Sequence, residues 1–276
     1  MLSASIFHND CVWYLMSILV IFLLNTCLIS SLMCLNDRLT HKIPLTTQRS
    51  FCWHCGHVLA WFDLIPIVSA LLTKSRCRYC QQPYGYTYVL FECLGGIIGT
   101  WLFPESELWL TALCLFFLAL EDWDQQAIHA NLLFPWLAYL VWIRWETLQL
   151  LVVGMFAVIC LWLTYVRHAL GSGDLPVLMV IGLVSSPIIL ALTLLTAALI
   201  TYGYLQYYTR RCAPFVPFLL VSWLIVIAIE KVITSVMWSL LLSMCDDFFL
   251  WLNGDVNIAL FCPNRHNTIG GNIATQ

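Results

Sequence analysis

Charge is what this sequence has least of: 10% of its 276 residues are charged, whereas 61% are hydrophobic. A soluble globular domain has roughly 25% charged and 45–50% apolar residues. A single core cannot enclose that much apolar surface, so the composition predicts that a lipid bilayer surrounds most of the chain. The sequence also lacks a basic tract, which argues against a nucleic-acid partner.

Two further absences narrow the class of protein. No Lys or Arg stands in the first ten residues, so we expect no cleavable signal peptide and a retained first helix over residues 13–32. No glycine-rich nucleotide-binding motif is visible either. We predict an all-α polytopic membrane protein with about eight transmembrane helices, nine being the alternative. The apolar segments span residues 13–33, 87–103, 107–121, 131–145, 148–166, 176–186, 187–208, 214–234 and 236–252.

The apolar pattern divides the chain into four regions. They are a first transmembrane helix (1–33), a polar loop (34–86), a membrane helical core (87–252) and a polar tail that we expect to be disordered (253–276). The polar loop carries six of the twelve basic residues, so the positive-inside rule predicts that it is cytoplasmic and that the N-terminus is periplasmic. Alternation of the helices then places Asp122 and Asp174 on the cytoplasmic face.

Four of the thirteen cysteines stand in a metal-binding pattern. The polar loop contains CWHC at Cys52–Cys55 and CRYC at Cys77–Cys80, with 21 residues between the two pairs. Two such turns can direct four thiolates at one tetrahedral ion, and paired CxxC motifs in a reducing cytoplasm favour zinc. We predict a structural zinc site, with His54 and His57 as spare donors. The alternative is a pair of redox-active or incidental CxxC motifs.

Two aspartates are the candidate catalytic residues. Ionisable groups near membrane helices are costly and suggest function. Asp174 follows Gly171 and Gly173, which permit close backbone approach, but before Pro176 it is also placed to cap a helix. Asp122 has its own alternative as a solvated residue at the membrane interface. If both aspartates face each other, they share a proton, and one activates water while the other polarises a carbonyl.

Several motifs, in this order, resemble those of bacterial type IV prepilin peptidases. The loop segment CWHCGHVLAWFDLIPIVSALLTKSRCRYC resembles the family's CxxCG, W-[FY]-D-L-I-P and second CxxC. The segment YVLFECLGG places Glu92 at a family glutamate, and EDWDQQAIHANLLFP resembles the segment with the first catalytic aspartate. GSGD matches the family's GxGD motif, and APFVPFL resembles its PFGPFL signature. The likeness covers residues from about 15 to 225.

The resemblance implies an eight-helix membrane aspartic peptidase with two activities. Its catalytic aspartates map to Asp122, rather than Asp124, and to Asp174. Such enzymes cleave the basic leader of prepilins and pseudopilins at the cytoplasmic side of the bacterial inner membrane. They then methylate the new N-terminal residue with S-adenosylmethionine, serving type IV pili or type II secretion. The resemblance therefore implies prepilin substrates and a methyl donor.

The sequence departs from the family pattern in a few places. Ile128-His129-Ala130 stands where the family has Ile-Pro-Asp, Pro176 replaces a lysine, and Val216 replaces a glycine. The first helix keeps little of its usual motif beyond Arg38-Leu39. These departures leave a second hypothesis open, a catalytically degenerate member that binds prepilins or assembly proteins. A third hypothesis, a membrane thiol oxidoreductase, rests on the number of cysteines alone.

Overall fold

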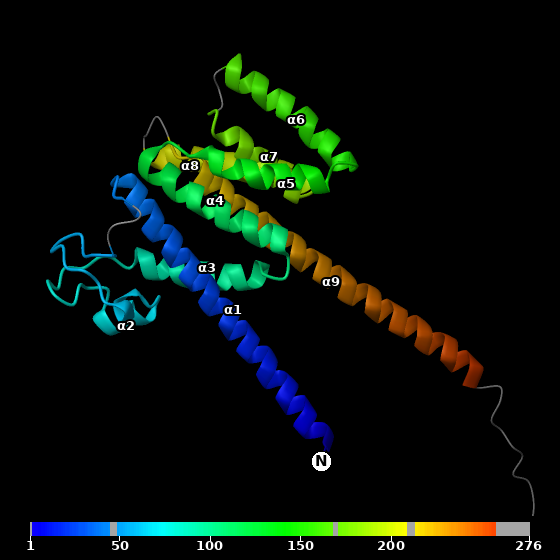
Figure 1. The fold of residues 1–276 in the computed structure, drawn as a ribbon. Coiled ribbons are helices and arrows are strands. Elements are labelled where there is room, and N and C mark those ends of the chain that lie inside the picture. The colour runs from blue at the N-terminus through cyan, green and yellow to red at the C-terminus, as the bar shows by residue number, and fades with distance from the viewer. Residues whose placement is uncertain (1, 45–48, 168–170, 209–212, 258–276) are drawn as a thin grey trace, which may run out of the picture. The chain divides into compact units, whose positions relative to one another are not determined.

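The structure, a computed structural model, describes residues 2–44, 49–167, 171–208 and 213–257 (Figure 1). The chain divides into two compact units, residues 1–226 and 227–276. The α-helices are α1 (Leu2–Thr40), α2 (Val68–Thr73), α3 (Thr87–Leu102), α4 (Ser106–Gln125), α5 (Phe134–Ile143), α6 (Leu148–Tyr165), α7 (Asp174–Val184), α8 (Pro187–Tyr208) and α9 (Val216–Asn257). Two 3-10 helices, Trp61–Leu64 and Ala130–Leu133, complete the order of elements.

The all-α prediction is confirmed, although the described residues form nine α-helices rather than eight. The additional helix is α2, six residues long, which lies inside the predicted cytoplasmic loop. The two apolar segments at 214–234 and 236–252 belong to one helix, α9. Among the described residues, four helices are long and apolar enough to cross a membrane, namely α1, α6, α8 and α9.

Two boundaries differ from those that the sequence predicted. Helix α1 continues seven residues beyond position 33 to Thr40, so the first part of the predicted loop is helical. Helix α9 reaches Asn257, inside the predicted disordered tail, and the rest of that tail lies outside the described residues. The boundaries differ because composition shows only where a segment stops being apolar, whereas a helix continues as far as its backbone hydrogen bonds do.

Small residues let α1 and α3 approach closely. A Cβ atom added at Gly95 would lie 2.4 Å from the Ile29 side chain, and one at Gly99 would lie 2.4 Å from Asn25. Asn25 is almost fully buried, and its Oδ1 accepts a hydrogen bond of 2.7 Å from the Trp109 indole of α4. Close packing at small residues is the usual basis of helix association in membranes, so α1, α3 and α4 form one packed group.

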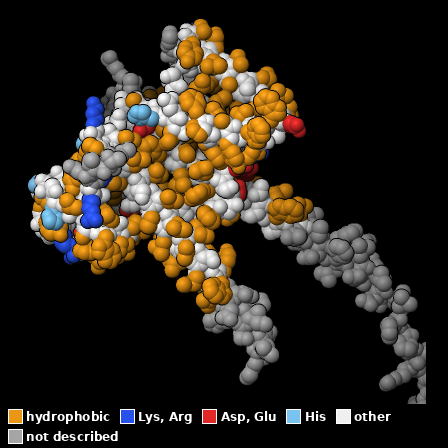
Figure 2. All heavy atoms as spheres, viewed as in Figure 1, with side chains coloured by type: hydrophobic (Ala, Val, Ile, Leu, Met, Phe, Trp, Pro, Cys, Tyr) orange, Lys and Arg blue, Asp and Glu red, His pale blue; other side chains and the backbone are white. Residues whose placement is uncertain are grey.

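The short helix α7 lies at the centre of the first unit. It packs against α4, α5, α6 and α8, and Val177, Val180 and Ile181 are completely buried. By contrast, α6 exposes apolar side chains such as Met155 (72%) and Leu151 (67%). Figure 2 shows such hydrophobic side chains covering much of the molecular surface, as expected of helices that face lipid. Because protein surrounds α7, its eleven residues need not span the bilayer alone.

Candidate functional site

The cysteine loop contains two turns of the same construction. In the first, the Gly56 N–H donates to the Cys52 carbonyl (2.8 Å); in the second, the Gln81 N–H donates to the Cys77 carbonyl (2.9 Å). The residue after the second cysteine of each motif has a positive φ, +71° at Gly56 and +59° at Gln81. Glycine adopts this conformation without steric cost, whereas Gln81 depends on its neighbours to hold it there. Both turns therefore present their cysteines in the same way.

The two turns bring all four predicted cysteines together. The Sγ atoms of Cys52 and Cys80 are 3.8 Å apart, those of Cys55 and Cys77 are 4.0 Å apart, and all four lie within 4.8 Å of one another. None of the four forms a disulfide. Sulfurs around a tetrahedral zinc ion, with bonds of about 2.3 Å, are separated by about 3.8 Å. The cluster can therefore hold a metal ion, and its spacing fits zinc.

The surroundings of the cluster act on its thiols in opposite directions: a hydrogen bond from the Gln82 backbone lowers the pKa of Cys80, but burial and the neighbouring thiols outweigh it and raise that pKa to about 11. Backbone N–H groups of Cys80 and Tyr79 donate to the Cys77 thiol and lower its pKa to about 7. The ring of His57 packs against Tyr79 of the other turn, with centroids 3.5 Å apart. Neither His57 nor His54 belongs to the metal-binding group found among the described residues.

A buried carboxylate attaches the cysteine loop to α3. Glu92, only 7% exposed, accepts a hydrogen bond of 2.8 Å from the Ile67 backbone N–H. Ile67 has a φ of +63°, which is uncommon for a β-branched residue. Within the loop, Asp63 and Arg78 form an ion pair of 3.1 Å that links the WFDLIP segment to the second turn. These contacts give physical roles to two residues of the recognised motifs, Asp63 and Glu92.

Asp122 lies near the end of α4, just after the apolar segment 107–121. Its Oδ2 accepts a hydrogen bond of 2.9 Å from the Val216 N–H, at the start of α9, and the Phe215 N–H also donates to this carboxylate. Burial raises the pKa of Asp122 above its ordinary value, and the two backbone donors oppose that shift. The APFVPFL segment therefore positions Asp122, a role that its sequence did not reveal.

Asp174 is the first residue of α7 and follows a tight turn. Its N–H donates to the Gly171 carbonyl (3.2 Å), and the Gly171 N–H donates to its carboxylate. A Cβ atom at Gly171 would lie 2.9 Å from Asp174 Oδ2, and one at Gly173 would lie 2.6 Å from Ile128. Gly173 has an ordinary φ of −74°. The GSGD glycines are therefore required for close approach rather than for a left-handed backbone.

The two aspartates interact electrostatically. Burial is the larger cause and the charge of Asp122 the smaller one, and together they raise the pKa of Asp174 to about 6. The helices that carry them, α4 and α7, pack against each other. Helix α7 begins at Asp174, so its N-cap residue is Gly173, which makes no side-chain capping hydrogen bond. A carboxylate that is buried near another charged carboxylate keeps its proton to a higher pH than a free one does.

A second buried carboxylate supports the pair. Glu121 is completely buried and accepts hydrogen bonds from the backbone N–H (3.0 Å) and the Nδ1 atom (2.9 Å) of His129. These bonds hold the segment in which Ile128 contacts Gly173. His129 stands at one of the positions where the sequence departs from the family pattern, and Glu121 accommodates it. Sequence reasoning noted Glu121 only as an acid near a helix end, because nothing local shows its partner.

The described residues thus define a class: a helical protein with helices long and apolar enough to cross a membrane, two aspartates at helix ends and a four-cysteine loop. Residues 23–105 match the sequence model of the bacterial peptidase A24 N-terminal domain, and residues 109–205 match that of the type IV leader peptidase family. The two matches together cover more than half of the chain. The chain belongs to the type IV leader peptidase family.

Individual relatives agree with this assignment. A prepilin leader peptidase/N-methyltransferase of Burkholderia pseudomallei strain 1026b is 31% identical over 168 residues, 54% of each chain. Proteins of the same name from Legionella pneumophila and Pseudomonas putida are each 26% identical, over 67% and 70% of this chain and 73% and 77% of theirs. The match spans about half the length of the Burkholderia relative. No solved structure matches the chain with significant similarity.

Proposed function

We propose that this protein removes the leader peptide from type IV prepilins or pseudopilins and then methylates the new N-terminus. The interaction of Asp122 with Asp174 at the ends of apolar segments carries the proposal. A prepilin joins a basic leader to an apolar helix, so its cleavage site lies at the membrane surface, where the apolar segments that carry Asp122 and Asp174 also end. We place the pair at the cytoplasmic face of the inner membrane, because the adjoining loop holds six of the twelve basic residues.

The chemistry follows from the unequal protonation of the pair. Ionised Asp122 takes a proton from a water molecule whose oxygen attacks the scissile carbonyl carbon, and protonated Asp174 donates its proton to the carbonyl oxygen. The tetrahedral intermediate then breaks its C–N bond as Asp122 passes the water proton to the leaving nitrogen, and Asp174 takes back its proton from the hydroxyl that becomes the product carbonyl. The backbone donors at Phe215 and Val216 favour Asp122 as the ionised member, while burial favours a protonated Asp174.

The proposed function requires a zinc ion and a methyl donor in addition to the protein. Zinc at Cys52, Cys55, Cys77 and Cys80 is structural, because four thiolates leave no open coordination position. S-adenosylmethionine supplies the methyl group. When bound, it would supply the methyl carbon to the amine nitrogen of the cleaved prepilin, would leave as its thioether, and the amine proton would pass to water.

Mass spectrometry of the reaction products tests both activities. The purified protein in lipid is incubated with a prepilin, with and without S-adenosylmethionine. Loss of the leader mass supports the peptidase, and a further methyl mass that requires the donor supports the methyltransferase. A folded, zinc-containing protein that binds prepilins but cleaves none of them would instead be the degenerate binder.

We expect kcat/KM for leader cleavage to fall as the pH rises through about 6, because Asp174 then loses the proton that it must donate. The same ionisation destabilises the fold, since the folded-state pKa lies above the unfolded value of 3.8. Asp174→Asn should therefore unfold at a higher temperature than the wild-type protein at pH 8, but not at pH 4. A flat activity profile between pH 5 and 8 would contradict this assignment.

Gly171→Ala tests the positioning of Asp174. The added Cβ would lie 2.9 Å from the Asp174 carboxylate and displace it, and misplacing a reacting group by about 1 Å costs roughly 100-fold in rate. We expect a loss of this order in the cleavage rate constant with little change in melting temperature. The matched control is Gly154→Ala in α6, where a Cβ atom meets nothing within 4 Å. Equal rates for the two variants would exclude a positioning role for the turn.

A further inference from the structure

One short segment contacts both of the helix ends that carry the candidate catalytic aspartates. Helix α4 ends soon after Asp122, and the following residue, Gln126, has a left-handed backbone (φ +53°) whose N–H donates to the Asp122 carbonyl (3.0 Å). Beyond this turn, Ile128 lies against Gly173, the residue that precedes Asp174. The position of one aspartate relative to the other therefore depends on how firmly this segment is held.

A hydrogen-bonded pair of residues holds the segment. Glu121 is completely buried, and its two carboxylate oxygens accept from the backbone N–H (3.0 Å) and from the Nδ1 atom (2.9 Å) of His129. A buried carboxylate is costly to leave unpaired, so these two bonds persist in the folded protein. His129 also caps the 3-10 helix Ala130–Leu133, which packs against α7. The pair thus anchors to α4 a segment that lies on α7.

The two members of the pair differ in burial. The side chain of His129 is 71% exposed, whereas that of Glu121 is 0% exposed. Removing the Glu121 carboxylate leaves a ring that water still solvates, whereas removing both donors of His129 leaves a carboxylate unpaired in the protein interior. This difference allows an effect on positioning to be separated from an effect on stability.

His129 stands where the family pattern has a proline. A proline ring fixes φ near −65°, and His129 has a similar φ of −82°. Proline has no N–H, however, so it could not donate the backbone hydrogen bond that Glu121 accepts from His129. In this chain two hydrogen bonds therefore take the place of the restriction that a proline ring would impose on the segment.

We propose that Glu121 and His129 act as one positioning unit for leader cleavage, which fixes Asp174 relative to Asp122. The inference rests on the peptidase half of the proposed function and names the residues that organise its site. The unit acts through the reacting carboxylates rather than on substrate binding, so its loss lowers kcat and leaves KM unchanged. Misplacing a reacting group by about 1 Å costs roughly 100-fold in rate.

Steady-state cleavage of a prepilin by the purified protein in lipid tests the inference. Glu121→Leu removes the acceptor without leaving a buried charge, so kcat should fall about 100-fold while KM and Tm stay at their wild-type values. Glu121→Gln keeps a carbonyl oxygen that accepts from the His129 N–H, so its kcat should stay within about tenfold of wild type. Rescue by glutamine indicates that the hydrogen bonds, and not the volume of the side chain, carry the effect.

His129→Pro, alone and together with Glu121→Leu, tests whether the two residues act as one unit. The single variant leaves Glu121 without its donors and should lower both kcat and Tm. The double variant removes the carboxylate with its partner, and proline holds the backbone near its native φ, so kcat should recover to within about tenfold of wild type. A double variant slower than either single variant would show that the residues act independently, and would overturn the inference.

Glu107 provides the matched control. It lies at the other end of α4 and pairs with Arg144, which follows α5, at 2.8 Å. Glu107→Leu breaks a pair of the same kind in the same helix, so it should leave kcat unchanged whatever it does to Tm. A fall in kcat equal to that of Glu121→Leu would show a general effect of losing an ion pair, and would overturn the positioning unit.

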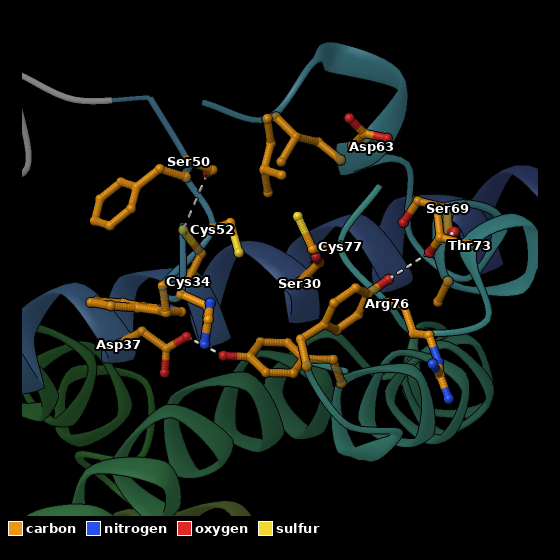
Figure 3. Close-up of a pocket in the computed structure, with 18 of the residues that line it drawn as sticks. Ser30, Cys34, Asp37, Ser50, Cys52, Asp63, Ser69, Thr73, Arg76 and Cys77 are labelled. Atoms are coloured by element: carbon orange, nitrogen blue, oxygen red, sulfur yellow. Dashed lines mark hydrogen bonds between the residues drawn. The ribbon is translucent and has the colours of Figure 1, made fainter. Parts of the chain in front are cut away.

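The cysteine loop provides an internal control for folding. A cavity of about 610 Å³ lies between α1, α3 and this loop, and Figure 3 shows Asp37 of α1 on one side of it and Cys52 and Cys77 on another. Within the described part of the chain, the lining of the cavity comes from these three regions, and neither Glu121 nor His129 belongs to it. Each variant should therefore bind zinc as the wild-type protein does.

The outcomes separate this inference from the proposed function. Wild-type kcat in Glu121→Leu, or a loss confined to Tm, overturns the positioning unit and leaves the peptidase proposal intact. A wild-type protein that binds prepilins but cleaves none of them overturns the peptidase proposal and this inference with it. A fall in kcat alone in Glu121→Leu, recovered in the double variant at normal zinc content, supports the unit.

Discussion

Asp122→Asn and Asp174→Asn are each expected to lower the rate constant of leader cleavage by about 100- to 10,000-fold, the usual contribution of a general acid or base. Asparagine neither accepts a proton from water nor donates an acidic one, yet its amide oxygen still accepts the backbone hydrogen bonds that hold each carboxylate. Single-turnover cleavage of a prepilin, followed by gel electrophoresis, measures the effect.

The chain offers a matched control for this experiment. Asp124 stands two residues from Asp122 in the same run, EDWDQQ, and accepts a hydrogen bond from Asn36 that asparagine can also accept. Asp124→Asn should retain near wild-type cleavage. If Asp122→Asn cleaves as fast as Asp124→Asn, then Asp122 is not part of the pair that performs the reaction. Melting temperatures no lower than that of the wild-type protein show that the losses are chemical rather than structural.

Loss of the metal is expected to disorder the cysteine loop. The turns around the four cysteines contain few buried side chains, and structural zinc contributes roughly 10–16 kcal/mol to the folding of small zinc domains. Cys55→Ser should lower the zinc-to-protein ratio from one to near zero and raise the rate of proteolysis within residues 49–84 at least tenfold. Elemental analysis and limited proteolysis with fragment masses measure these effects.

A second exposed cysteine provides the comparison. Cys27 on α1 is exposed like Cys55 but lies outside the cluster, so Cys27→Ser should keep its zinc. A strong chelator should reproduce the Cys55→Ser result in the wild-type protein and leave the Cys55→Ser variant unchanged. Full zinc content in Cys55→Ser would show that the other residues suffice to bind the ion. An intermolecular or mixed disulfide trapped at these cysteines, together with absence of zinc, would instead support a thiol oxidoreductase.

Local patterns in the sequence predicted much of this protein. The scarcity of charge predicted a helical membrane protein, because only closed hydrogen-bonded structures are stable in lipid. The repeated CxxC spacing predicted the cluster of Cys52, Cys55, Cys77 and Cys80, since each turn is a local structure whose geometry the short spacing determines. The GSGD motif identified Asp174 as a candidate catalytic residue, and the neighbouring residues alone predicted that it stands at the start of a helix.

Only the tertiary structure decided the contacts between segments distant in the chain. Nothing near Asp122 indicates that the start of α9, 94 residues later, donates to its carboxylate. The partnership of Glu121 with His129, the burial of the short α7, and the cavity between α1, α3 and the loop likewise depend on which helices pack together. Helix periodicity reports which face of a segment is apolar, but not which neighbour covers it, and the site is built from those neighbours.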